Sequence, residues 1–92
     1  MPTIRIDAEV LVNHLKILLK LVHPHDDRLF SVVMLAFVKF GIVNEAELAD
    51  ELRQSLPTIK RWVRGRNLPG QNVRPQIHKW LGNKLEEISR QQ

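Results

Sequence analysis

The chain has 92 residues, of which 43% are hydrophobic and 26% are charged, and it contains no cysteine. This length and balance are typical of one small globular domain, and the chain is too short for a large enzyme with an enclosed active site. The lack of cysteine excludes disulfides, cysteine-ligated zinc and a thiol nucleophile. The formal net charge of +4 is compatible with a polyanionic partner such as nucleic acid.

Nothing in the chain predicts a targeting or membrane segment. Asp7 places an acid where a signal peptide would have its cationic start. The most apolar run, residues 29–38, is far shorter than the roughly 20 residues that a membrane-spanning helix requires. We therefore expect a cytoplasmic protein that makes no membrane contact.

Charge is distributed unevenly along the chain. Residues 1–50 carry five basic and seven acidic side chains, whereas residues 51–92 carry nine basic and three acidic ones. No acid occurs between Glu51 and Glu86, a stretch that contains Arg53, Lys60, Arg61, Arg64, Arg66, Arg74, Lys79 and Lys84. Such a stretch forms either an ordinary solvated basic face or a surface for a phosphate backbone, and helix periodicity must distinguish the two.

Apolar periodicity predicts an all-α fold of five helices, preceded by a short extended arm over residues 3–6. The helices are expected over residues 7–22, 27–40, 45–52, 56–64 and 72–89. The candidate N-caps are Asp7, Asp26 or Asp27, Asn44 and Ser55, and Gly41 and Gly65 are the candidate stops. Trp62 and Trp80 lie on apolar arcs and are expected in the core.

The first two helices are more apolar than surface helices need to be. In the first, Glu9, Asn13, Lys16 and Lys20 share one narrow arc, and apolar residues fill most of the rest. This exceeds the stripe of about 100° that a surface helix buries, so a second contact is expected, most simply a subunit partner. The helix over 27–40 is apolar on every side, which predicts a central position.

The segment between these two helices contains side chains that can bind metals, namely His23, His25, Asp26 and Asp27. The same residues also fit a loop followed by a helix cap. No other set of residues has metal-site spacing, so we expect no metal and no cofactor.

Residues 45–52 and 56–64 form two short helices joined by a tight turn, which is the pattern of a helix-turn-helix. On the second helix, Leu56, Ile59, Trp62 and Val63 share one arc, and Pro57, Lys60, Arg61 and Arg64 share the opposite arc, with Thr58 at its edge. The exposed arc has three cations and no acid. A helix with such a face fits the major groove of B-DNA.

These residues resemble a known family. Ala46-Glu47-Leu48-Ala49, followed by Thr58-Ile59-Lys60-Arg61-Trp62-Val63-Arg64-Gly65 and Leu68-Pro69, is similar to the helix-turn-helix of lambda-repressor-like, Cro/Xre-type regulators. The resemblance covers about residues 28–88. It implies that Ser55, Leu56, Pro57, Thr58 and Arg61 meet base edges or adjacent phosphates, and that Glu45, Arg64 and Arg66 lie near phosphates.

The chain departs from the family pattern at two places. Arg53 stands where the family commonly has a turn glycine, so the turn is expected to be reshaped. Leu56 and Pro57 have no side-chain group that can hydrogen-bond a base. Direct readout is therefore expected to rest mainly on Arg61, with Thr58 or Leu56 against a thymine methyl.

The expected organisation is one domain, in which residues 1–26 form an arm and an extra amphipathic helix suited to dimerisation, and residues 27–92 form the helix-turn-helix module. We expect a sequence-specific regulator of transcription, a small repressor that binds double-stranded DNA. A homodimer would occupy a near-palindromic operator with its recognition helices about 34 Å apart. The candidate DNA-binding residues are Ser55, Leu56, Pro57, Thr58, Lys60, Arg61, Arg64 and Arg66.

The alternative function is that of a protein-interaction module, such as an antitoxin or adaptor, which works through its apolar N-terminal helix. The sequence contains neither a nucleophile–base pair nor a glycine-rich phosphate loop. We therefore expect no catalysis and no small-molecule substrate.

Overall fold

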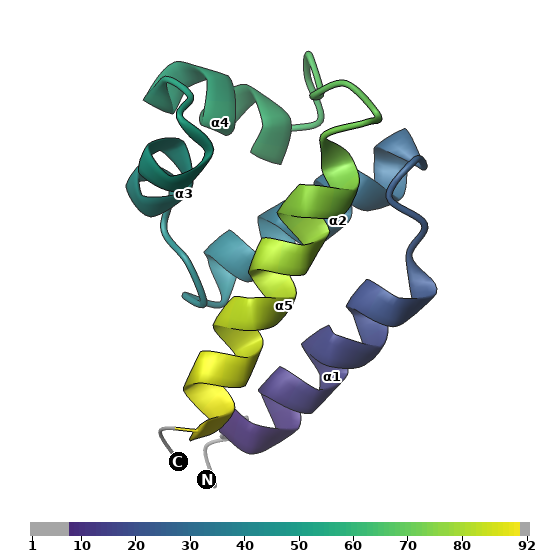
Figure 1. The fold of residues 1–92 in the computed structure, drawn as a ribbon, viewed down its shortest axis with the longest axis vertical. Helices are drawn as coiled ribbons and strands as arrows, with labels where there is room; N and C mark the ends of the chain where they lie inside the picture. Colours follow the sequence, from purple (N-terminus) through teal and green to yellow (C-terminus); the bar gives the residue numbers. More distant parts are fainter. Residues whose placement is uncertain (1–7, 91–92) are drawn as a thin grey trace, which may run out of the picture.

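The computed structural model describes residues 8–90, which form five α-helices and contain no strand. The helices are α1 (Ala8–Leu21), α2 (Asp27–Lys39), α3 (Glu45–Leu52), α4 (Leu56–Val63) and α5 (Arg74–Arg90) (Figure 1). The all-α expectation is confirmed, and the observed boundaries lie within two residues of the predicted ones. The arm expected over residues 3–6 and the cap expected at Asp7 lie outside the described residues.

Three helices begin at the N-caps that the sequence predicts. Asp26 Oδ1 accepts a hydrogen bond from the Leu29 N–H at 2.9 Å, which identifies Asp26 and not Asp27 as the cap of α2. Asn44 Oδ1 accepts from the Glu47 N–H at 2.7 Å at the start of α3. Ser55 caps α4 in the same way. Each cap satisfies a backbone donor that has no partner inside its helix.

Three helices also end alike, each with a residue of positive φ. These residues are Gly41 after α2, Arg53 after α3 and Gly65 after α4, with φ of 76°, 54° and 81°. In each case the next backbone N–H bonds a carbonyl five residues back, as Gln54 bonds the Ala49 carbonyl at 2.9 Å. This is the Schellman closure, in which glycine is the usual residue. The turn at Arg53 thus keeps the geometry of a glycine turn, although it has a side chain.

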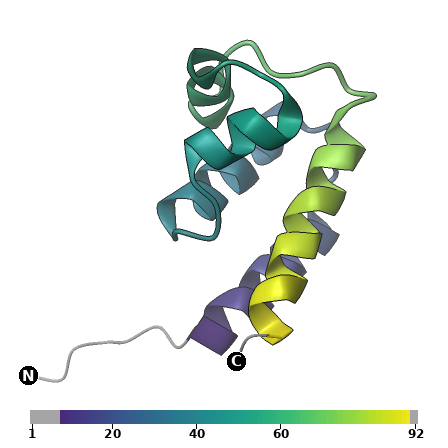
Figure 2. The ribbon, with the colours of Figure 1, turned by 60° about the vertical axis from the view of Figure 1, so that its left-hand side comes forward.

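The helices pack as two pairs joined by α2. The long helices α1 and α5 lie along one another, α3 packs on α4, and α2 contacts both α1 and α4 (Figures 1 and 2). The Cα radius of gyration is 13.4 Å, which is near the value of about 12 Å expected for a compact chain of this length. The pair α3–α4 and the helix α1 therefore lie on different sides of the molecule.

The core is built around one face of α2. Phe30, Val33, Met34 and Phe37 are fully buried there, and they pack with Leu48, Ile59, Ile77, Leu81 and Leu85 from the other helices. The opposite face of α2 is open, with Leu29, Val32 and Leu35 exposed by 38–47%. The predicted central position holds for the inner face of α2, which lies in the core, but not for its outer face, which remains exposed.

None of the helices within residues 8–90 is long and apolar enough to cross a membrane.

Candidate nucleic-acid interface

The helix α4 divides sharply into a buried and an exposed face. Ile59, Trp62 and Val63 point inward and are at most 8% exposed. Lys60 and Arg61 lie outward on the same helix. Because the apolar face is held in the core, the cationic face is presented to solvent in one fixed orientation.

The start of α4 is organised by two hydroxyl groups. Ser55 Oγ accepts from the Thr58 N–H at 3.3 Å and lies 2.8 Å from Thr58 Oγ1. Pro57 falls within the first turn, where a backbone donor is not required. Leu56 is 39% exposed and Thr58 is half-buried, so both predicted thymine contacts remain reachable from solvent.

The end of α4 is anchored on α2. Ser31 Oγ donates to the carbonyl groups of Trp62 and Val63 at 3.4 and 3.5 Å. A Cβ atom at Gly65 would lie 3.1 Å from this same hydroxyl, and Gly65 has positive φ. Glycine is therefore required there by backbone conformation, with little room for a side chain. The close approach of Gly65 to Ser31 sets where Arg64 and Arg66, on either side of it, leave the helix.

We use the term α4 surface for the eight residues predicted to bind DNA: Ser55, Leu56, Pro57, Thr58, Lys60, Arg61, Arg64 and Arg66. The structure brings all eight together on α4 and its two flanking turns, and seven of them are exposed. None of its four cations forms an ion pair with any residue between 8 and 90, whereas Lys16, Arg74 and Lys84 all do. The positive charge of the α4 surface is therefore not neutralised by the described part of the protein.

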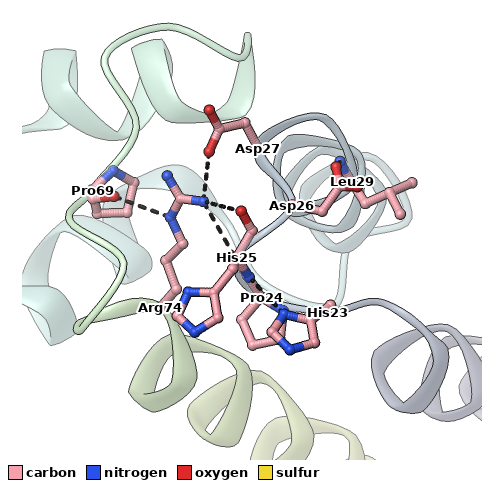
Figure 3. Close-up of polar contacts among 8 residues, drawn as sticks. All are labelled: His23, Pro24, His25, Asp26, Asp27, Leu29, Pro69 and Arg74. Atoms are coloured by element: carbon pink, nitrogen blue, oxygen red, sulfur yellow. Dashed lines mark hydrogen bonds and ion pairs between the residues drawn. The ribbon is translucent and has the colours of Figure 1, made fainter.

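Arg74 does not contribute to this surface, although it lies in the acid-free stretch of the sequence. Its side chain is only 5% exposed, and its Nη1 lies 2.7 Å from Asp27 Oδ1 (Figure 3). The same guanidinium donates to the carbonyl groups of Pro24, His25 and Pro69 at 3.1–3.3 Å. Arg74 thus ties the α1–α2 connection to the loop that leads into α5.

The position of Arg74 in the sequence indicates this structural role, although a count of charges along the chain does not. Arg74 begins α5, and a cation is electrostatically unfavourable at a helix N-terminus. A cation in that place indicates a specific partner.

Lys84, which lies in the same acid-free stretch, is also paired with carboxylates. Its Nζ donates to Glu47 Oε2 at 3.1 Å and lies 3.6 Å from Glu87 Oε2. The hydrogen bond that Lys84 donates to the Glu47 carboxylate is the main cause that raises the pKa of Lys84. The ammonium group also lies 5.3 Å from the centre of the Trp80 ring. Trp80 is half-buried against the core and Trp62 is buried, so neither offers a free face for base stacking.

The helix that packs beside α4 has the opposite charge. α3 contains Glu45, Glu47, Asp50 and Glu51 and no basic residue. Glu47 turns toward Lys84, and Asp50 and Glu51 are exposed. These carboxylates limit the cationic surface on the α3 side, so the unpaired positive charge lies on α4 and the loop after it and not on the pair of helices as a whole.

The histidines do not assemble a metal site in the described residues. The rings of His23 and His25 lie 4.9 Å apart, and no group of three or more metal-binding side chains occurs within residues 8–90. His78 stacks on Phe30 with ring centres 5.7 Å apart, and its Nε2 is buried without a hydrogen-bond partner. Desolvation of this ring lowers the pKa of His78.

No known family model matches the chain, and no curated protein or solved structure is significantly similar to it.

Proposed function

We propose that the protein is a sequence-specific regulator that binds double-stranded DNA through the α4 surface. The observation that carries this proposal is the fixed, exposed and unpaired cationic face of α4. The binding free energy of a polyanion is most favourable where cations have a fixed, exposed position and are not already paired with carboxylates. The motifs shared with Cro/Xre-type regulators favour the same conclusion.

The residues of the α4 surface divide by their chemistry into two groups. Arg61, near the middle of the outward face, has the forked guanidinium that recognises guanine O6 and N7 together, and Thr58 or Leu56 can meet a thymine methyl. Lys60, Arg64 and Arg66 supply charge to the phosphates. In this arrangement the phosphate contacts position the helix and the base contacts select the sequence.

A helix of eight residues reaches only a few base pairs, so one copy reads a short sequence. The proposal therefore includes a homodimer on a near-palindromic site, with half-sites separated by a whole number of DNA turns. Occupation of a promoter would then repress transcription.

The test combines selection and salt dependence. Duplexes that bind the protein are selected from a random pool, and the affinity for the best sequence is measured at several salt concentrations. If about five phosphates are contacted, the logarithm of the affinity falls with the logarithm of salt at a slope near −4.5. The double variant R61A/R64A should lose the selected binding. A matched control, K39A/K79A, removes two exposed cations elsewhere and should retain it. Binding that is absent, that does not depend on salt, or that the two variants weaken equally would overturn the proposal.

A second candidate function is a protein-interaction module, such as an antitoxin or adaptor. The observation that favours it is the exposed apolar face of α1, where Val10, Ile17 and Leu21 are 46%, 54% and 78% exposed. Sedimentation of the purified protein separates the two functions. A monomer that forms a complex only with a different protein favours the adaptor, and a stable homodimer favours the regulator.

A further inference from the structure

Exposed hydrophobic side chains are concentrated on the two helices that the α4 surface does not use. Among the described residues, nine large hydrophobic side chains are exposed. Three lie on α1, three on α2 and one at the C-cap of α2, and the other two are Leu56 and Val73. Single exposed hydrophobic residues are normal on a protein surface, but an aligned row of them marks a contact. The row on α1 is the most exposed.

The row on α1 consists of Val10, His14, Ile17 and Leu21, which we call the α1 stripe. These positions are separated by four, three and four residues, so they share one face of the helix. One ring nitrogen of the polar member is already bonded, because His14 Nδ1 donates to the Val10 carbonyl at 2.7 Å. The stripe therefore offers a largely apolar surface about 17 Å long, from Val10 to Leu21 along α1.

The spacing of the stripe is the same when read from either end. In an antiparallel pair of α1 helices, Val10 of one copy faces the partner's Leu21, and His14 faces the partner's Ile17. Both contacts occur twice, which is the condition for a closed two-fold interface between identical chains. A different partner protein would not require this symmetry.

The charges beside the stripe are complementary in the same arrangement. Glu9 and Lys20 lie on one flank of the stripe, at opposite ends of α1. An antiparallel two-fold pair brings like flanks together, so Glu9 of one copy lies near the partner's Lys20. A parallel two-fold pair would bring opposite flanks together, so neither Glu9 nor Lys20 would lie near its complementary charge.

From these observations we propose that the α1 stripe is the interface of a homodimer, with the two α1 helices antiparallel about a two-fold axis between His14 and Ile17. Because α1 lies away from α3 and α4 in the fold, this pairing leaves both α4 surfaces open (Figure 1). The contact is short, so we expect a dissociation constant in the micromolar range. The proposal goes beyond DNA binding and does not depend on it.

The first experiment measures self-association by sedimentation over a concentration series without DNA. The wild-type protein should show a monomer–dimer equilibrium, and I17K should raise the dissociation constant by about 100-fold, since it removes an apolar contact twice. The matched control is V73K, at a residue that is 40% exposed and lies outside α1, which should leave the equilibrium unchanged. Thermal unfolding of I17K checks that the variant folds. A wild-type protein that stays monomeric, or equal effects of the two variants, would overturn the proposal.

The second experiment tests the orientation of the helices. Because the chain has no cysteine, V10C and L21C each introduce one thiol into a clean background. Mild oxidation of a mixture of the two variants should yield mainly the V10C–L21C disulfide, because only these positions face one another in the antiparallel pair. A control with Q76C, at an exposed residue of α5, should not cross-link to either variant. Mainly V10C–V10C and L21C–L21C products would show a parallel pair and overturn the proposal.

The two proposals fail independently. A monomer that binds duplex with the expected salt slope overturns the interface and the dimeric site, and leaves DNA binding by the α4 surface. A dimer that binds no duplex overturns the function and leaves the interface.

Discussion

The guanidinium of Arg74 lies 2.7 Å from the carboxylate of Asp27, and the two residues begin α5 and α2, helices far apart in the sequence (Figure 3). The burial of the pair is unequal, since Arg74 is 5% exposed and Asp27 is 71% exposed at the side chain. Arg74 also lies 5.2 Å from the centre of the Phe30 ring. The contacts of Arg74 with the backbone of two loops and with Phe30 are therefore expected to stabilise the fold more than its salt bridge with Asp27 does.

The variant R74M should lower the free energy of unfolding by about 3 kcal/mol, because three backbone carbonyls lose a buried donor. The variant D27N should cost at most about 1 kcal/mol, since the carboxylate is mainly solvated. Urea unfolding of both variants measures the difference. Equal losses would mean that the ion pair, and not the backbone contacts, carries the stability.

The folded R74M variant should keep the wild-type dependence of DNA affinity on salt, because Arg74 does not belong to the α4 surface.

The variant R61A should weaken binding to the selected duplex by about 1–3 kcal/mol and relax the preference at one base position. The physical reason is the loss of a bidentate contact to one base, whereas a phosphate contact would be lost equally on every sequence. Fluorescence anisotropy with the selected duplex and a scrambled duplex separates these effects. The control K79A, on the exposed side of α5, should change neither value. Equal losses on both duplexes would reassign Arg61 to the phosphate backbone.

The variant R53G should stabilise the protein by about 1 kcal/mol. Arg53 has φ of 54° and ψ of 45° in a Schellman closure, a conformation that costs most residues with a side chain about 1–2 kcal/mol. Glycine removes this cost, and the turn already has the required hydrogen bonds. Thermal and urea unfolding measure the gain, and G65R, which introduces the same strain beside Ser31, should be strongly destabilising. A loss of stability in R53G would show that the arginine side chain stabilises the turn.

The stability of the protein should fall as the pH drops below about 6.5, the ordinary pKa of histidine, and His78 should account for part of the fall. The pKa of His78 is lowered in the folded state, so the unfolded chain binds a proton at a pH where the folded chain does not. The contribution is therefore complete above the unfolded value and is lost toward acid, by at most about 1.4 kcal/mol per pH unit.

The variant H78F tests this assignment, because phenylalanine can keep the stack on Phe30 but does not titrate. As the pH falls from 7 to below about 6.5, the unfolding free energy of the wild type should decrease relative to that of H78F. His14, His23 and His25 are present in both proteins and cancel in the comparison. A difference that stays constant with pH would exclude His78 as the source.

Most of the secondary structure could be predicted from local signals. Asn44 followed by Glu47, and Ser55 followed by Pro57, are cap patterns whose hydrogen bonds form within four residues, so no other part of the chain is needed to interpret them. Gly41 and Gly65 are likewise local, because only the backbone at the helix end decides whether a positive φ is needed.

The candidate site could be predicted for the same reason. Which cations of the basic stretch are paired with carboxylates could not be predicted. The α4 surface lies on one short helix, and the period of 3.6 residues alone separates Lys60 and Arg61 from Ile59 and Trp62. Arg74 and Lys84 belong to the same basic stretch, but their partners Asp27 and Glu47 are 47 and 37 residues away in the chain.

The sequence by itself therefore determined five helices, the N-caps of α2, α3 and α4, and a cationic face on α4. Only the tertiary structure decided which cations remain unpaired and which apolar faces remain uncovered, as on α1 and on the outer side of α2. The physical reason is that charge neutralisation and burial depend on which helices become neighbours. A periodic pattern shows that a face must be covered, but only the packed fold shows whether a helix of the same chain covers it.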